Sequence, residues 1–272
     1  MVAMRRAAHQ IFDNPKVFDD PIALPILGPG TEERIRSESR FLNRLGRAVR
    51  ASMAARSRYA EDQLARSVER GVRQYVILGA GLDTFGYRNP HSQPDLRVFE
   101  VDYPATQEWK RGRLAAAGIA IPPSVIFAPV DFEHQTLAEG LREAGFDAAK
   151  PAFFSWLGVT MYLERETVMS TFRFIASCGR GSGVTFDYIV PRETLNWTGQ
   201  LILRAMERRV ARAGEPFRTY LASAQLCEEL ERIGFRKIED LGGAEMNERY
   251  FKDRADGLRV PGVLGRFMTA ET

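Results

Sequence analysis

Cysteine and histidine are scarce in this chain of 272 residues. There are two cysteines, Cys178 and Cys227, and three histidines, and all of them are widely spaced. A disulfide framework needs more cysteines, and a zinc site needs pairs of ligands a few residues apart. A chain of this length also buries enough surface to fold without such crosslinks. We therefore expect no disulfide and no metal site.

Long hydrophobic runs are also lacking. The longest mostly apolar run, residues 153–163, contains Ser155 and Thr160 and is too short to span a bilayer. Behind Arg5 and Arg6 no apolar core with a small-residue cleavage site follows, so we expect no signal peptide. Hydrophobic residues make up 44% and charged residues 27%, as in ordinary globular proteins. We expect a soluble, cytoplasmic protein with no membrane partner.

The charge is unevenly spread but forms no block of one sign. Residues 1–73 carry 14 Arg and Lys against 9 Asp and Glu, a net charge of +5, and the remainder carries 24 against 26, a net charge of −2. Acidic residues are interleaved with the arginines of the first part, which indicates solvated helix faces. No basic patch with interleaved aromatic residues is present, so no nucleic-acid partner is expected.

From residue 74 on, strand-like segments alternate with helix-like segments. This alternation predicts an α/β fold of the Rossmann-like kind, with a mostly parallel central sheet flanked by helices. The expected strands are residues 74–78, 97–101, 125–130, 152–157, 184–190 and 235–241, and the expected helices are residues 105–117, 135–144, 166–178, 193–213 and 223–233.

The part before residue 74 has a different pattern. Residues 16–30 are rich in proline, and residues 31–70 contain no proline and predict two helices. We expect residues 1–73 to form a helical extension or cap, and residues 74–272 to form a cofactor-binding core with an insertion at about residues 191–220. The two parts would together make one structural domain.

A glycine loop follows the first expected strand. Gly79 and Gly81 come directly after Leu78, at the carboxyl end of a strand, where open α/β sheets bind ligands. Asp102 ends the second strand 21 residues after Gly81, where an acidic side chain accepts hydrogen bonds from ribose hydroxyls in nucleoside-binding folds. The alternative for Asp102 and the nearby Glu100 is ordinary strand-end polarity.

The missing third glycine narrows the choice of nucleoside. Thr84 stands where the dinucleotide fingerprint G-x-G-x-x-G has its last glycine, and Asp83 precedes it with a negative charge. No G-x-x-x-x-G-K-[ST] phosphate loop is present. These absences disfavour NAD and ATP and favour a nucleoside cofactor without phosphates, of which S-adenosylmethionine is the commonest.

Six segments in order carry a resemblance to a known family. The chain resembles the leucine carboxyl methyltransferase-like family of class I S-adenosylmethionine-dependent methyltransferases, and within it a bacterial branch. The resemblance covers nearly the whole chain and implies a methyltransferase with S-adenosyl-L-methionine as cofactor. The segments are KVFDDPIALPILG (16–28), AARSRYAEDQL (54–64), ILGAGLDTFGYR (77–88), VFEVDYPATQEWKRGRL (98–114), PVDFE (129–133) and LGVTMYL (157–163).

The resemblance also implies a set of cofactor-binding residues. Arg56 would pair with the methionyl carboxylate of the cofactor, a task that suits a planar guanidinium. Asp102 would hold the ribose hydroxyls. The main chain at Gly79 and Gly81 would approach the cofactor, and Asp131 and Phe132 would line the adenine pocket.

One position departs from the family pattern. Carboxyl methyltransferases of this family often have an acidic residue directly before the glycine of the fourth strand's loop, and here Leu157 precedes Gly158. The chain must then hold the cofactor differently, and its acceptor need not be a protein terminus. Of the aromatic residues nearby, Trp156 is expected in the core, and Tyr162 either faces the substrate or packs.

No catalytic residue emerges from the sequence. A carboxylate is already an anion at neutral pH and needs no general base, whereas a hydroxyl does. His134 is a lone loop histidine, expected to be solvated. The absence of a convincing base favours a carboxylate acceptor.

Three functions remain open. They are O-methylation of a small-molecule carboxylate or hydroxyl, methylation of a protein C-terminal carboxylate, and a non-catalytic cofactor-binding or nucleic-acid-associated role; a dehydrogenase ranks fourth. The N-terminal helices and the insertion are the expected substrate cover. The apolar insertion residues suit a hydrophobic acceptor or core packing, and the oligomeric state stays open. These residues are Leu201, Leu203 and Met206, beside Thr198.

Overall fold

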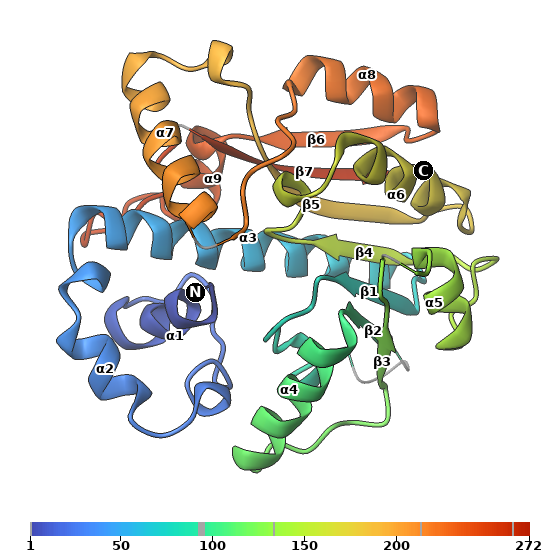
Figure 1. Cartoon of the computed structure of the whole chain (residues 1–272), viewed down its shortest axis with the longest axis horizontal. Helices are drawn as coiled ribbons and strands as arrows, with labels where there is room; N and C mark the ends of the chain where they lie inside the picture. Colours follow the sequence, from blue (N-terminus) through green and yellow to red (C-terminus); the bar gives the residue numbers. More distant parts are fainter. Residues whose placement is uncertain (1, 92–95, 133, 213, 263) are drawn as a thin grey trace.

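A seven-stranded sheet forms the centre of the molecule (Figure 1). The computed structural model describes residues 2–91, 96–132, 134–212, 214–262 and 264–272. The strand order is β3-β2-β1-β4-β5-β7-β6, and only β7 runs antiparallel to its neighbours. This arrangement confirms the predicted Rossmann-like α/β fold with a mostly parallel sheet. The strands are β1 (Gln74–Leu78), β2 (Arg97–Asp102), β3 (Val125–Pro129), β4 (Phe153–Trp156), β5 (Gly183–Ile189), β6 (Lys237–Leu241) and β7 (Gly265–Glu271).

The central strands are apolar because helices cover both faces of the sheet. Every residue of β1, β4 and β5 is buried. Parallel strands that are covered on both faces appear in a sequence as continuous hydrophobic runs and not as alternating patterns. These strands could therefore be predicted from the sequence. The observed bounds of β1 are those predicted, and the other five predicted strands are present with bounds shifted by one or two residues.

Among the described residues, six α-helices follow the first strand. They are α4 (Pro104–Ala116), α5 (Leu137–Glu143), α6 (Arg165–Ser177), α7 (Trp197–Arg212), α8 (Ser223–Ile233) and α9 (Gly243–Tyr250). The bounds of α8 are those predicted, and Leu226 and Leu230, which lie one turn apart on its apolar side, are buried. Helix α9 was not predicted.

The predicted helix over residues 193–213 is wrong at its start. A short 3-10 turn, η5 (Arg192–Thr194), is followed by extended chain, and α7 begins at Trp197. The reason is local, because the Asn196 side chain accepts a hydrogen bond from the Gly199 amide at 2.9 Å and so caps a new helix. Ala213, the last predicted residue, lies outside the described residues.

The N-terminal region contains three helices. They are α1 (Val2–Phe12), α2 (Thr31–Ser37) and α3 (Arg44–Glu69). The two helices predicted within residues 31–70 are α2 and α3, and α1 was not predicted. Asn43 caps α3 by accepting from the Gly46 amide at 2.7 Å.

The long helix α3 lies along one face of the sheet (Figure 1). Its Leu64 and Val68 pack with Tyr75 of β1, and its Tyr59 packs with Phe267 of β7. The proposed division at residue 73 stays a prediction. No helix within the described ranges is long and apolar enough to cross a membrane.

Strand β7 was missed entirely. It inserts between β5 and β6 and pairs with both in antiparallel register, with Phe186 opposite Met268. Phe267, Met268 and Ala270 of this strand are all buried. The short segment has no partner near in sequence for its pairing with β5, so its strand state depends on contacts that form only in the fold.

Candidate functional site

The glycine loop lies where the strand order reverses, between β1 and β4. Gly79 adopts a φ of +67°, a conformation that side chains disfavour. A Cβ atom added at Gly79 would also lie 2.6 Å from a methyl carbon of Val159. The loop after β1 therefore touches the loop after β4, and the two loops share the carboxyl edge of the sheet where α/β proteins bind ligands.

Asp102 is fixed beside this loop by main-chain donors. One carboxylate oxygen accepts from the Gly81 amide at 2.6 Å, and the other accepts from the Tyr103 amide at 2.7 Å. Each oxygen keeps a lone pair for a further donor. The carboxylate is thus held in place before any ligand arrives, as an acceptor for a pair of hydroxyl groups would need.

Asp131 and Phe132 follow β3, next to Asp102. The Val130 amide donates to the Asp102 carbonyl at 3.0 Å, which joins the two strand ends. The Phe132 side chain is 58% exposed, unusual for a large aromatic residue, and the Asp131 carboxylate contacts the His134 imidazole at 3.1 Å. An open aromatic face beside a carboxylate suits a flat base with an exocyclic amine. Glu133, the last residue of the PVDFE segment, lies outside the described residues.

Arg56 reaches the site from α3 and ends beside the loop after β4. Its side chain is 8% exposed, and its Nη1 contacts an Asp187 carboxylate oxygen at 3.1 Å. Gly158 has a φ of +73°, and a Cβ atom there would lie 2.8 Å from Nη1 of Arg56. Glycine is needed at this position because the guanidinium lies directly against the main chain.

The residues predicted to bind the cofactor fall in one line along the carboxyl edge. Following the strand order, Asp131 and Phe132 come first, then Asp102, then the glycine loop, and last Gly158 with Arg56. The order runs from an aromatic surface through a diol acceptor to a buried cation. S-adenosylmethionine has the matching order of adenine, ribose and amino-acid carboxylate. The residues present therefore fit this cofactor, and their individual roles stay predictions.

Two buried acids near the site were not among the predicted site residues. Asp187 lies in β5 and meets Arg56, and Glu100 in β2 contacts Lys110 at 2.7 Å with both side chains 1% exposed. Burial raises the pKa of Glu100 even though Lys110 favours its charged form. Glu100 is thus not solvated strand-end polarity. An acidic residue inside an otherwise apolar strand is the sequence signal that could have indicated both acids.

The remaining singled-out residues separate into core and surface. Trp156 is 2% exposed and packs edge-on against Phe172, which confirms its core assignment. The His134 side chain is 77% exposed. Tyr162 is half-buried against Phe217, with ring centroids 5.5 Å apart. Leu157 offers no carboxylate, and the acid that the structure places beside Gly158 is Asp187.

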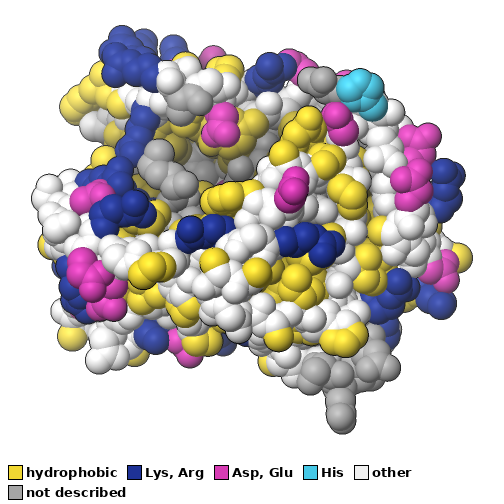
Figure 2. Space-filling view, turned by 60° about the horizontal axis from the view of Figure 1, so that its bottom comes forward, with side chains coloured by type: hydrophobic (Ala, Val, Ile, Leu, Met, Phe, Trp, Pro, Cys, Tyr) yellow, Lys and Arg dark blue, Asp and Glu magenta, His cyan; other side chains and the backbone are white. Residues whose placement is uncertain are grey.

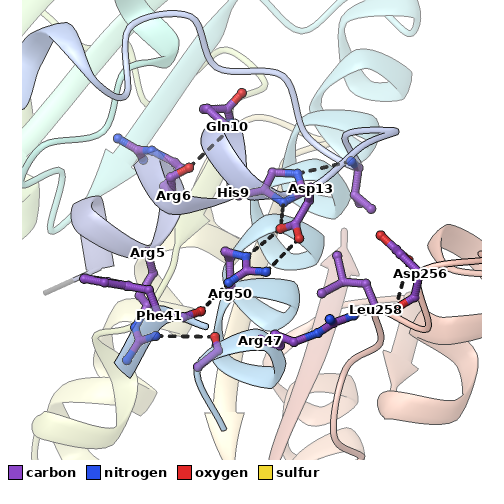
Figure 3. A network of polar contacts seen from close by, with 12 residues as sticks. Arg5, Arg6, His9, Gln10, Asp13, Phe41, Arg47, Arg50, Asp256 and Leu258 are labelled. Atoms are coloured by element: carbon purple, nitrogen blue, oxygen red, sulfur yellow. Dashed lines mark hydrogen bonds and ion pairs between the residues drawn. The ribbon is translucent and has the colours of Figure 1, made fainter. Parts of the chain in front are cut away.

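Helix α1 holds the N-terminal region against the glycine loop. Arg6 donates to the Leu82 carbonyl and contacts the Asp20 carboxylate at 2.8 Å. Figure 3 shows how α1 is tied to α3 through His9, Asp13 and Arg50. The expected cover from the N-terminal helices therefore lies beside the candidate site.

The insertion is held beside the same edge. Leu203 of α7 is buried in one cluster with Met161 and Ile189, which follow β4 and end β5. The Arg218 amide also donates to the Met161 carbonyl at 2.8 Å. The insertion therefore adjoins the end of the site where Arg56 lies.

Comparison with known proteins decides the family. The sequence model described as leucine carboxyl methyltransferase matches residues 1–176. The chain belongs to this family. A Bacillus subtilis protein named "Putative S-adenosyl-L-methionine-dependent methyltransferase YktD" is 33% identical over 281 residues, covering 94% of this chain and 91% of that protein. A relative from Mycobacterium marinum with the same description is 32% identical over 69% of this chain and 64% of its own length.

Solved structures similar to this member of the leucine carboxyl methyltransferase family support the fold. A DUF574 family protein from Streptomyces avermitilis has a TM-score of 0.62 at 18% identity, covering 91% of this chain and 94% of that one. A "putative methyltransferase" from Thermobifida fusca has a TM-score of 0.60 at 15% identity, covering 100% and 94%. The protein is an S-adenosylmethionine-dependent methyltransferase of the leucine carboxyl methyltransferase family, and S-adenosylmethionine is its cofactor. This excludes the dehydrogenase alternative.

Proposed function

We propose that the protein transfers a methyl group to an oxygen atom of a small-molecule acceptor, and that this oxygen belongs to a carboxylate in preference to a hydroxyl. Bound S-adenosylmethionine supplies the electrophilic methyl group. The chain's task is then to hold donor and acceptor in line, with the reacting atoms about 3 Å apart. Asp102 would hold the ribose of the donor, and Arg56 would hold its amino-acid end.

The state of the side chains around Arg56 carries the choice of a carboxylate. Burial, together with the charges of Glu215 and Asp187, raises the pKa of Tyr162, so this phenol stays protonated and acts as a donor at neutral pH. His134 follows β3, separated from β4 by two strands. Neither residue is placed to take a proton from an acceptor beside Arg56. A carboxylate needs no such base.

The positive charge of the cover also supports an anionic acceptor. Burial and the nearby Arg209, Arg40 and Arg50 lower the pKa of Arg5 in α1. Arg5 of α1 therefore lies close enough to Arg209 of the insertion for their charges to interact. Neighbouring positive charges at this border favour the approach of an anion. On the face shown in Figure 2, in contrast, basic and acidic side chains are interleaved, which favours a small molecule over a nucleic acid.

Exposed apolar residues of α7 support an acceptor with a hydrophobic body. Leu203 packs in the core, so core packing accounts for this position. Leu201 is 52% exposed, Met206 is 38% exposed, and Trp197 is 73% exposed. These three side chains are available to contact an apolar ligand, since core packing does not use them.

The test compares matched acids and alcohols as acceptors. The purified protein is incubated with S-adenosylmethionine labelled in the methyl group and with acid–alcohol pairs of the same apolar skeleton. Methyl esters release labelled methanol in alkali and methyl ethers do not. We expect alkali-labile product from the acids, with kcat/KM nearly flat between about pH 6 and 9, because a carboxyl group of pKa about 4 is ionised throughout.

Three outcomes would contradict this proposal. One is alkali-stable product from the alcohols alone. Another is a rate that rises about tenfold per pH unit, as for an uncatalysed loss of a phenolic proton of pKa about 10. The third is methylation of peptides ending in leucine in preference to every small acid. The Asp102→Ala variant serves as the control for label transfer that does not depend on the cofactor site.

A further inference from the structure

The guanidinium of Arg56 is buried and only partly used. Its Nη1 contacts Asp187, while its Nε is buried and has no hydrogen-bond partner among the described residues. A buried donor without a partner is unfavourable, and a ligand acceptor would relieve this cost. The Nε–H and one Nη2–H of arginine point to the same side and form the fork that grips a carboxylate with two parallel hydrogen bonds. This fork is the part of Arg56 that no described residue uses.

Asp187 holds the opposite side of the same guanidinium. One of its carboxylate oxygens lies 3.1 Å from Nη1 of Arg56, and the other accepts a hydrogen bond from the Gly158 amide. The Asp187 side chain is 13% exposed, so its charge is mostly desolvated. A single carboxylate thus joins α3, the end of β5 and the turn after β4.

We propose that Asp187 is the positioning residue for Arg56 in binding the amino-acid end of the cofactor. It neutralises the buried guanidinium and holds it by Nη1, so that the Nε–Nη2 fork keeps one orientation for an incoming α-carboxylate. This inference rests on the proposed role of Arg56. It assigns a carboxylate of β5 to the cofactor site although that residue lies 131 positions away in sequence.

The alternative to a positioning role is that Asp187 only links α3 to the sheet and does not affect ligand binding. Glu239 provides a comparison within the same molecule, because it ties β6 to the same helix by accepting from Tyr59 at 2.8 Å and Gln63 at 2.9 Å. Glu239 also pairs with Arg249 at 2.7 Å. If acids that link a strand to α3 act only on stability, the two acids should behave alike towards ligands.

The experiment uses two ligands that differ only in the amino-acid part. S-adenosylhomocysteine carries the α-carboxylate, and 5′-methylthioadenosine has the adenosine and the sulfur without any amino acid. Calorimetric titration is carried out on the full chain and on the variants Asp187→Asn, Arg56→Met, the double variant and the control Glu239→Gln. Circular dichroism and a thermal melt establish that each variant is folded.

We expect Asp187→Asn to lower the affinity for S-adenosylhomocysteine at least about tenfold, which is the scale of one lost charge-assisted interaction. Its affinity for 5′-methylthioadenosine should stay within about twofold. Arg56→Met should show the same split, and the double variant should bind no more weakly than Arg56→Met alone, because the two residues act as a unit. Glu239→Gln should leave both affinities unchanged.

Equal losses for the two ligands in Asp187→Asn would overturn the proposal in favour of a structural role. An unchanged affinity for S-adenosylhomocysteine would overturn it as well, as would a further tenfold loss when Asp187→Asn is added to Arg56→Met. If Asp187→Asn does not fold, Asp187→Glu gives the same test with the charge kept but displaced. Failure of Arg56→Met to discriminate the ligands would instead contradict the Arg56 assignment itself.

Discussion

At the scale of single residues, Asp102 resembles Asp187 in being a carboxylate of the candidate site that main-chain amides hold in place. Its two oxygens are already oriented by the amides of Gly81 and Tyr103. An acceptor held in place before binding loses little freedom when the ligand arrives, so it contributes more to affinity than a mobile side chain would.

Replacement of Asp102 with alanine is expected to weaken the binding of every adenosine ligand to the same extent. Loss of a charged acceptor for the ribose hydroxyls should lower the affinities for S-adenosylhomocysteine and for 5′-methylthioadenosine by about tenfold or more. The same calorimetric titrations measure this. Glu108→Ala, at an exposed position of α4, is the control and should change neither affinity. An Asp102→Ala protein that is folded and binds both ligands normally would contradict the ribose assignment.

At the scale of elements, the site depends on how α1 is fastened to α3 (Figure 3). Asp13 accepts from Arg50 at 2.6 Å and contacts the His9 imidazole at 2.7 Å, and all three side chains are nearly fully buried. His9 in turn accepts from the Val17 amide at 3.1 Å through its other ring nitrogen. The tautomer with a proton only on Nδ1 satisfies both contacts.

This buried network makes a prediction about acid stability. Burial alone would raise the pKa of Asp13, but hydrogen bonds from Arg50 and His9 outweigh it, and the net effect lowers the pKa. A lowered carboxyl pKa contributes stability above the unfolded value of about 3.9, and that contribution is lost as the pH falls through the folded value. Below about pH 4 this contribution should therefore shrink, and the link between α1 and α3 itself should weaken only when the pH reaches the lower folded-state pKa of Asp13.

Asp13→Asn should lower the free energy of unfolding by about 3 kcal/mol at pH 7, because it leaves the buried Arg50 without its counter-ion. The difference from the parent protein should shrink on acidification below about pH 4, as Asp13 is protonated first in the unfolded state and, at lower pH, in the folded state. Urea unfolding at both pH values measures this. Asp19→Asn, which removes an exposed partner of Lys16, is the control and should have no measurable effect. A constant difference at all pH values would contradict the role of the Asp13 charge.

At the scale of the whole molecule, the candidate site joins parts that are distant in sequence. The loops after β1, β2, β3 and β4 form its floor, and α1, α3 and the insertion border it. A ligand that binds only when these parts are assembled stabilises the folded state by mass action.

S-adenosylhomocysteine at about 100 times its dissociation constant should add about 2.7 kcal/mol to the stability. For a chain of this size that corresponds to a rise in Tm of roughly 5–10 °C. NAD should give no shift, since Thr84 replaces the third glycine and Asp83 adds a negative charge beside the loop. A thermal melt monitored by circular dichroism measures both. A shift with NAD equal to that with S-adenosylhomocysteine would contradict this account of the glycine loop.

The sequence by itself determined the elements whose signal is local. Strand β1 and helix α8 have the predicted bounds because each has a signal within a short window of sequence. The strand has a run of apolar residues, and the helix has apolar residues that repeat every three to four positions. The glycine loop and Asp102 were likewise found from their place at the ends of two strands. The six matched segments added the roles of Arg56, Asp131 and Phe132, which the residues alone would not have revealed.

Only the tertiary structure decided the features that depend on distant partners. Strand β7 exists through its pairing with β5, and Asp187 becomes part of the site only when β5 and α3 are brought together. Arg6 meets the glycine loop across 76 positions. Forming each of these contacts costs chain entropy, and this cost is offset only when the whole sheet has formed. No short stretch of sequence therefore encodes such a contact alone. Local patterns therefore determine which strands and helices form, and long-range packing determines which buried charges lie at the carboxyl edge of the sheet.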